Sequence, residues 1–171
     1  MKRDKSVYRR KEIGHWEVDT VVSGIGKSKA CFATLAGRKT RYYIAVWIPN
    51  RKAETMENAI VKALSHLPNE MAKSITCDRG QRICELAKHR EKTKLRDVFC
   101  RSVLCVEKGT NENSNGLLRE FYPKGRNLSR VSEKTLKKNL ALINARPKKI
   151  LNYQTPADLF EQELNKVLHL V

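Results

Sequence analysis

The sequence has few aromatic residues, little negative charge and no long hydrophobic run. Aromatic side chains make up 6% of the 171 residues. The longest apolar runs, such as YYIAVWI (42–48), have the length of a strand and are too short for a helix that crosses a bilayer. The N-terminal residues, MKRDKSVYRRK, lack the apolar core of a secretory signal. We therefore expect a cytoplasmic protein without a membrane span.

Cysteines are few and show no ligand pattern. The five cysteines form no CxxC pair, and none has a histidine at metal-ligand spacing. They are Cys31, Cys77, Cys84, Cys100 and Cys105. Reduced thiols in a cytosolic protein explain this set, and a structural zinc is not expected.

Positive charge is what the chain has in excess. Lys and Arg number 35 against 18 Asp and Glu, which gives a formal net charge of +17 and a pI near 9.9. Such an excess favours a polyanionic partner, and nucleic acid is the first candidate. A membrane surface is the alternative, but the sequence lacks the basic amphipathic helix that this would need.

Apolar periodicity predicts an α/β fold. Alternation in HWEVDTVVS (15–23), followed by the apolar stretches ACFATLAG (30–37) and RYYIAVWIP (41–49), predicts three strands in an antiparallel meander. The remaining predicted elements are a helix over 54–67, a strand at SITCD (74–78), a helix over 85–94, a strand at DVFC (97–100), a helix that begins near Glu112 and a helix over 131–146. We therefore expect a mixed five-stranded sheet of meander and crossover strands, flanked by helices.

The same patterns suggest domain boundaries. We expect a basic N-terminal arm over 1–13, one domain over 14–160 and a C-terminal tail over 161–171. In the predicted helix that begins near Glu112, the stripe of Leu117, Leu118 and Phe121 should be buried. Glu112, Asn115 and Arg119 should share the opposite face.

Three carboxylates stand where strands and a helix could bring them together. Asp19 lies inside an apolar strand, where a charged group needs a cation or other compensation. Asp78 stands at the end of a short strand, and Glu112 begins a helix within GTNENSNG (109–116). Each acid alone is more often a solvated or capping residue. Together they could bind Mg²⁺, which prefers oxygen ligands and needs only a few carboxylates.

Several motifs carry a resemblance to a known family. The chain is similar, over about 14–160, to the catalytic domain of the IS-thirty family of bacterial insertion-sequence transposases. The matching motifs are HWEVDTV, TLAGRKTR, ITCDRG, GTNENSNGLLREFYPKG and NARPKKILNYQTP. By these motifs, Asp19 and Asp78 match the two catalytic aspartates, and Glu112 of TNEN matches the catalytic glutamate. The interval between Asp78 and Glu112 (79–111) has the length expected for that family.

The resemblance implies both fold and function. It implies an RNase H-like fold and DDE chemistry, in which Asp19, Asp78 and Glu112 bind two Mg²⁺ or Mn²⁺ ions. The implied substrates are transposon-end and target DNA, which are cleaved and then joined by strand transfer. A homo-oligomer on DNA and association with the bacterial nucleoid are expected as well.

The chain also departs from the family pattern. Relatives usually carry a helix-turn-helix region before the catalytic domain, and this chain starts just upstream of the first predicted strand. Relatives also show a segment like FCDPxSPWQRGTNEN, where this chain has FCRSVLCVEKGTNEN, and the whole stretch 82–108 matches poorly. These departures suggest a truncated or degenerate copy. The alternatives are a nonenzymatic DNA-binding remnant and an RNase H-like nuclease that acts on RNA–DNA hybrids.

Polar and basic residues around Glu112 and near the C-terminus are candidate DNA contacts. The asparagines could instead cap the helix, and the cations could simply be solvated. The candidates are Asn111, Asn115, Arg119, Lys124, Arg146, Lys148 and Lys149.

Overall fold

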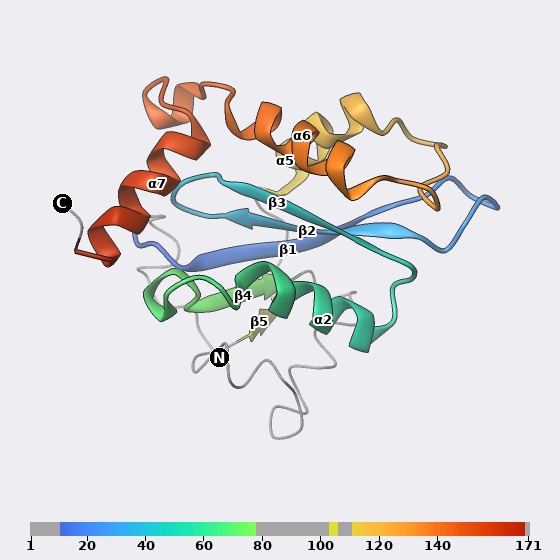
Figure 1. Cartoon of the computed structure of the whole chain (residues 1–171), viewed down its shortest axis with the longest axis horizontal. Coiled ribbons are helices and arrows are strands. Elements are labelled where there is room, and N and C mark those ends of the chain that lie inside the picture. The colour runs from blue at the N-terminus through green and yellow to red at the C-terminus, as the bar shows by residue number, and fades with distance from the viewer. Residues whose placement is uncertain (1–10, 78–102, 106–110, 170–171) are drawn as a thin grey trace.

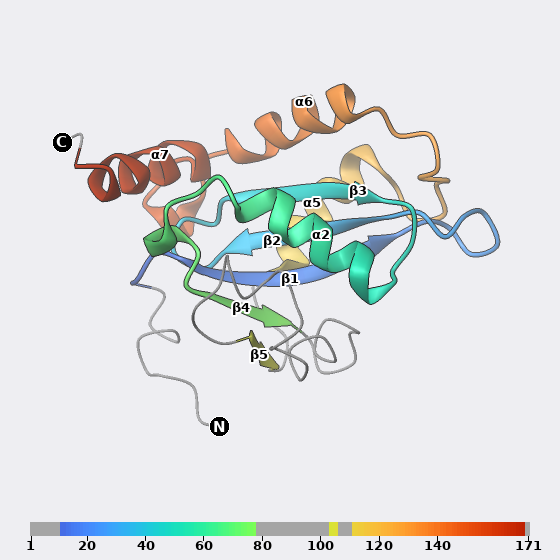
Figure 2. The same cartoon turned by 60° about the horizontal axis from the view of Figure 1, so that its bottom comes forward.

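A mixed sheet with helices on both faces forms the centre of the molecule (Figures 1 and 2). The computed structural model describes residues 11–77, 103–105 and 111–169. Its elements are β1 (His15–Val22), β2 (Cys31–Gly37), β3 (Tyr43–Ile48), α2 (Ala53–Leu64), the 3-10 turn Asn69–Met71, β4 (Ser74–Cys77), β5 (Val103–Cys105), α5 (Asn111–Phe121), α6 (Glu133–Asn144), the 3-10 turn Lys149–Leu151 and α7 (Pro156–Val167). In Figure 1, α2 covers one face of the sheet, and α5 and α6 cover the other.

The strand order is β3-β2-β1-β4-β5. β1, β2 and β3 are antiparallel neighbours, whereas β4 runs parallel to β1 and β5 runs parallel to β4. The predicted meander and the five-stranded mixed sheet are therefore confirmed. β1 is the central strand, so its side chains reach both helical layers.

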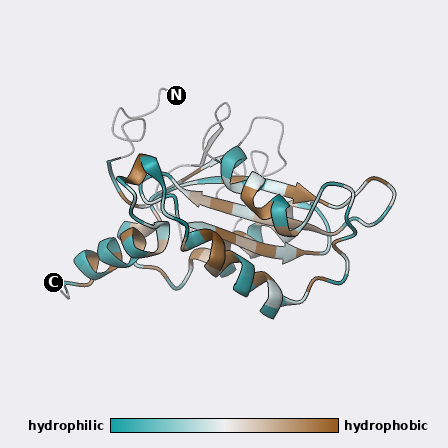
Figure 3. Cartoon of the chain, turned by 90° about the horizontal axis from the view of Figure 1, so that it is seen from above, coloured by the Kyte–Doolittle hydropathy of each residue, from teal (hydrophilic) through white to brown (hydrophobic). Residues whose placement is uncertain are grey.

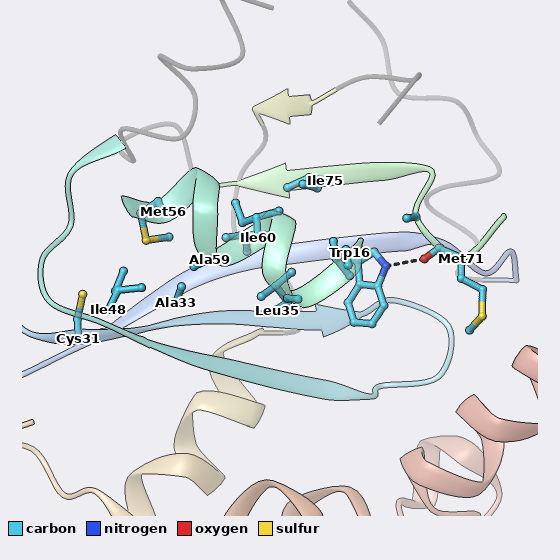
Figure 4. Packing of buried hydrophobic residues seen from close by; sticks show 14 of the residues in the cluster. Trp16, Cys31, Ala33, Leu35, Ile48, Met56, Ala59, Ile60, Met71 and Ile75 are labelled. Carbon is cyan, nitrogen blue, oxygen red and sulfur yellow. Dashed lines mark hydrogen bonds between the residues drawn. The ribbon is translucent and has the colours of Figure 1, made fainter. Parts of the chain in front are cut away.

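Two hydrophobic cores lie on the two faces of the sheet. Figure 3 shows that hydrophobic (brown) and hydrophilic (teal) residues alternate along the strands and helices. Trp16 and Val18 belong to the core under α2, whereas Val21 belongs to the core under α5 and α6. Trp16 is 1% exposed, and its indole N–H donates to the carbonyl of Met71 at 2.8 Å (Figure 4). This hydrogen bond satisfies the polar atom of a large buried side chain and fixes one end of β1.

Several predicted boundaries differ from the structure. The helix predicted over 54–67 ends at Leu64. Leu67 lies in the turn that follows the helix, from which it packs against the core under α2. The expected tail over 161–171 is helical through Val167, and α7 packs Phe160 against the core under α2. Ile13, expected in the N-terminal arm, packs against the same core.

Two predicted elements fall outside the described residues, namely the helix over 85–94 and the strand over 97–100. The fifth strand that the structure describes is β5, Val103–Cys105. Among the described helices, none combines the length and hydrophobicity that a bilayer crossing requires.

The segment after α5 makes close backbone contact with the end of β1. The Gly24 amide donates to the carbonyl of Arg126 at 2.9 Å. A Cβ on Gly24 would lie 2.3 Å from the carbonyl oxygen of Gly125, far inside van der Waals contact. Next to this contact, the hydroxyl of Ser23 accepts a hydrogen bond from the amide of Leu128 at 3.1 Å. Gly24 therefore lets the chain that leaves α5 dock on β1.

We expect Gly24→Ala to lower the free energy of unfolding by about 1–3 kcal/mol, because the added methyl group has only backbone to displace. Gly116→Ala is the matched control, since a Cβ on that exposed α5 residue meets nothing within 4 Å. It should raise stability by about 0.5–1 kcal/mol through helix propensity. Equilibrium urea unfolding measures both effects. Equal changes in the two variants would contradict the proposed role of the contact.

Candidate functional site

Asp19 lies on the face of β1 that α5 covers. Its side chain is half-buried, and both of its carboxylate oxygens accept hydrogen bonds. Oδ1 accepts from the backbone amide of Thr20 at 2.7 Å, and Oδ2 accepts from Nδ2 of Asn115 at 2.8 Å. The carboxylate is therefore held at a defined angle between β1 and α5.

The first turn of α5 carries Glu112 and is attached to β1. Asn111 is buried, and its Nδ2 donates to the backbone carbonyl of Glu17 at 3.2 Å. Glu112 is exposed in the first turn, where a carboxylate interacts favourably with the helix dipole. Residues three apart are neighbours on a helix surface, so Glu112 lies one turn before Asn115, the residue that binds Asp19. Asn111 and Asn115, on either side of Glu112 in the sequence, thus both bind β1.

Asp78 lies outside the described residues. The residue before it, Cys77, pairs in parallel register with Val18, the residue before Asp19. Within the described parts of the chain, no three His, Cys, Asp or Glu side chains gather to form a metal site.

Tyr43 of β3 is a site residue that the sequence patterns did not indicate. It is 1% exposed, and its hydroxyl donates to Oδ1 of Asn115 at 2.6 Å. Burial, with a smaller contribution from the negative charge of Asp19, raises the pKa of the Tyr43 phenol, so it remains a hydrogen-bond donor at neutral pH. In the sequence, Tyr43 is simply one of several large residues in a strand.

A buried ion pair adjoins Asp19 along the same face of β1. Nη1 of Arg38 lies 3.2 Å from Oε1 of Glu17, and both side chains are less than 10% exposed. Glu17 precedes Asp19 by two residues and therefore points the same way from the strand. Arg38 thus compensates the buried negative charge of Glu17 on this face of the sheet.

The predicted DNA-binding residues divide into two groups. Arg119 donates to the backbone carbonyl of Val22 at 3.0 Å, and Arg146 forms a two-point ion pair with Glu120 at 2.7 and 3.1 Å. Asn111 and Asn115 bind β1, as described above, and Lys148 is half-buried. Only Lys124 and Lys149 of the predicted set are exposed without such an internal role among the described contacts.

The predicted faces of α5 are partly confirmed. Leu118 is fully buried, and Leu117 and Phe121 pack at the margin of the same core. Asn115 and Arg119 do not point away from the sheet, as expected, but along its surface toward β1. The reason is that α5 lies across β1 with polar contacts beside its apolar stripe.

Asn111→Ala should lower the free energy of unfolding by about 1 kcal/mol, the typical net value of a buried hydrogen bond. Asn113→Ala is the control, because Asn113 is exposed on the same helical turn and should change stability by less than about 0.5 kcal/mol. Thermal and urea unfolding of both variants would measure this difference. If the two changes had the same effect, the bond to the Glu17 carbonyl would not anchor α5.

Comparison with known proteins identifies related transposases. The transposase of insertion sequence element IS30A of Escherichia coli is 37% identical over 163 residues, which cover 94% of this chain and 41% of the relative. A probable transposase for element IS1161 of Streptococcus salivarius is 36% identical and is covered to 45%, with 93% of this chain matched. The transposase for element IS4351 of Bacteroides fragilis is 35% identical and is covered to 49%, with 96% of this chain matched. The chain thus spans less than half the length of these relatives. No protein-family model matches it.

Solved structures with a similar fold are integrase catalytic cores. The catalytic core domain of HTLV-2 integrase, solved in complex with magnesium, aligns with a TM-score of 0.61 at 15% identity and covers 86% of this chain and 97% of its own. The core domain of BIV integrase aligns with a TM-score of 0.62 at 15% identity, covering 90% and 98%. These similarities confirm the expected α/β, RNase H-like fold. Taken with the transposase relatives, they confirm the resemblance that the motifs indicate: over 93–96% of its length, the chain is similar to insertion-sequence transposases of the IS30 family.

Proposed function

We propose that the chain carries the catalytic domain of a DDE transposase, which cleaves transposon-end DNA and joins it to target DNA in a reaction that depends on divalent metal. The observation that carries this proposal is the attachment of α5 to β1 at Asp19, which brings the helix that begins at Asn111 and Glu112 against the central strand. The transposase relatives and the integrase-core fold support the same chemistry.

The donor set suits a hard divalent cation. Asp19 offers two carboxylate oxygens, with about four lone-pair sites between them, and hydrogen bonds from β1 and α5 orient both oxygens. Glu112 adds a second carboxylate, and we propose Asp78 as the third, which the pairing of Cys77 with Val18 supports. Such oxygen ligands suit Mg²⁺ or Mn²⁺. Two bound ions would activate the attacking oxygen and stabilise the leaving oxygen of the phosphodiester.

The remaining parts of the chain would hold DNA. The net charge of +17 favours the phosphate backbone, and the exposed Lys124 and Lys149 are the proposed contacts. Joining two transposon ends requires a homo-oligomer on DNA, and a location at the bacterial nucleoid follows from the substrate. We also propose that the catalytic domain extends beyond residue 160 to include α7, because that helix packs on the core.

Asp19→Asn and Glu112→Gln should each lower Mg²⁺- or Mn²⁺-dependent nicking of a supercoiled plasmid by about 10²-fold or more, since even the outer partners of metal ligands are worth about 10–100-fold. Glu161→Gln, at an exposed α7 position, is the control and should act like the parent. Variants as active as the parent would refute the carboxylate assignment. A parent that binds duplex DNA but never nicks it would favour the nonenzymatic remnant, and preferential cleavage of RNA–DNA hybrids would favour the nuclease.

Lys149→Gln should weaken binding to a labelled DNA duplex, whatever the base sequence of the duplex. It should also reduce the slope of log affinity against log salt concentration by about 1. Arg146→Gln should change the slope less, because the Arg146 guanidinium is already paired with Glu120. Fluorescence anisotropy at several salt concentrations measures both slopes. A larger loss with Arg146→Gln would show that DNA displaces the Glu120 pair.

A further inference from the structure

A chain of hydrogen bonds leads from the edge of the sheet to the Asp19 carboxylate. The amide of Asn144 in α6 binds the backbone of Tyr43, the Tyr43 hydroxyl binds Asn115, and Asn115 binds Asp19. We propose that Tyr43 and Asn115 are positioning residues that orient Asp19 for cation binding, and that Asn144 holds Tyr43 in place. The proposal rests on the proposed function only in taking Asp19 as a metal ligand.

The chemistry of the groups fixes which one donates and which one accepts at each step of this series of hydrogen bonds. A carboxylate can only accept, so Nδ2 of Asn115 must face Asp19, at 2.8 Å. Oδ1 of Asn115 can also only accept, so the Tyr43 hydroxyl must donate, at 2.6 Å. Replacing the phenol with a group that cannot donate would remove the partner that holds the Asn115 amide in this orientation.

The two hydrogen bonds to Asp19 fix its carboxylate plane. Oδ1 is held by the Thr20 amide, which belongs to the strand itself, and Oδ2 is held by Asn115 of α5. Loss of the Asn115 bond would remove the contact that ties Oδ2 to α5, and the carboxylate would be held less firmly about its last torsion. A cation site loses affinity when a ligand is free to rotate, because binding must then restrict that rotation.

Tyr43 is itself held rigidly. Its backbone N–H donates to Oδ1 of Asn144, and its carbonyl accepts from Nδ2 of Asn144, both at 2.8 Å. Tyr43 is 1% exposed and Asn144 is 4% exposed, so neither side chain has room to reorient. The hydroxyl of Tyr43 therefore meets α5 from a fixed point on β3.

This assignment gives Asn115 a role other than DNA contact. One amide N–H and the carbonyl oxygen of its side chain are engaged inside the protein, between β1 and β3. Substitutions at Asn115 should therefore alter cation binding even when no DNA is present.

The test is Tyr43→Phe, which keeps the buried ring and removes only the hydroxyl. Tyr122→Phe is the matched control, because Tyr122 is 2% exposed and its hydroxyl accepts from Asn139, away from Asp19. Calorimetric titration of the DNA-free protein with Mn²⁺ should give a dissociation constant about 10-fold higher for Tyr43→Phe than for the parent, and an unchanged one for Tyr122→Phe. Asn115→Ala should raise it at least as much.

A double-mutant comparison separates positioning from general loosening. Adding Tyr43→Phe to Asn115→Ala should cause no further loss of Mn²⁺ affinity, because Tyr43 acts through Asn115. Additive losses, or equal affinities for Tyr43→Phe and Tyr122→Phe, would overturn the positioning role.

A metal-free measurement distinguishes this role from the proposed function. The side-chain amide NMR signals of Asn115 should shift in Tyr43→Phe and in Asp19→Asn but not in Tyr122→Phe. If the signals were unchanged in both Tyr43→Phe and Asp19→Asn, the hydrogen-bond chain would be refuted. Mn²⁺ binding that depends on Asp19 but not on Tyr43 would overturn the positioning role alone. Mn²⁺ binding unaffected by Asp19→Asn would overturn the proposed function and the positioning role together, even with the NMR shifts present.

Discussion

The candidate site depends on how α5 lies along β1. Asn111 binds the Glu17 carbonyl, Asn115 binds the Asp19 carboxylate and Arg119 binds the Val22 carbonyl. Four residues of helix advance about 6 Å, and the two strand residues from Glu17 to Asp19 advance about 6.7 Å, so the two elements stay nearly in step there. The next strand step, from Asp19 to Val22, is three residues, and the long side chain of Arg119 spans it. A helix and a strand that run in the same direction can therefore form repeated polar contacts, and one of these contacts involves Asp19.

Apolar packing makes these polar contacts possible. Leu118 and Tyr122 fill the core under α5 and α6, and the ring of Tyr122 meets Phe32 of β2 edge-to-face at 4.9 Å. Such burial provides most of the driving force that holds a helix on a sheet, whereas each hydrogen bond adds about 1 kcal/mol net. The polar contacts set the register of α5 on β1, and the core sets its distance. Both are needed if two carboxylates from different elements are to share cations.

The strands and most of the helices could be predicted from the sequence, but the side-chain contacts between these elements could not. The alternation in HWEVDTVVS places Trp16 and Val18 on one face of the strand and Val21 on the other, as the two cores do, because strand periodicity depends only on local chain geometry. The partners of Asp19 could not be read in this way, because Tyr43 and Asn115 come from separate elements and their contact depends on the tertiary fold. The helix α7 was missed although its start is signalled: Thr155 caps it by accepting from the amide of Asp158, and Pro156 occupies its first turn. Phe160, Leu164 and Val167 also recur at helical spacing and pack together in the core under α2, so the tail expected from residue 161 overlooked a helix that the sequence signals.

Asn144 has a consequence for the behaviour of the protein in solution. β3 is an outer strand of the sheet, and an outer strand presents free backbone groups to which another polypeptide can add. At Tyr43 the side-chain amide of Asn144 occupies both of these groups and leaves no place there for a foreign strand. The Asn144 side chain that holds Tyr43 in place thus also prevents another strand from adding to the sheet at this position.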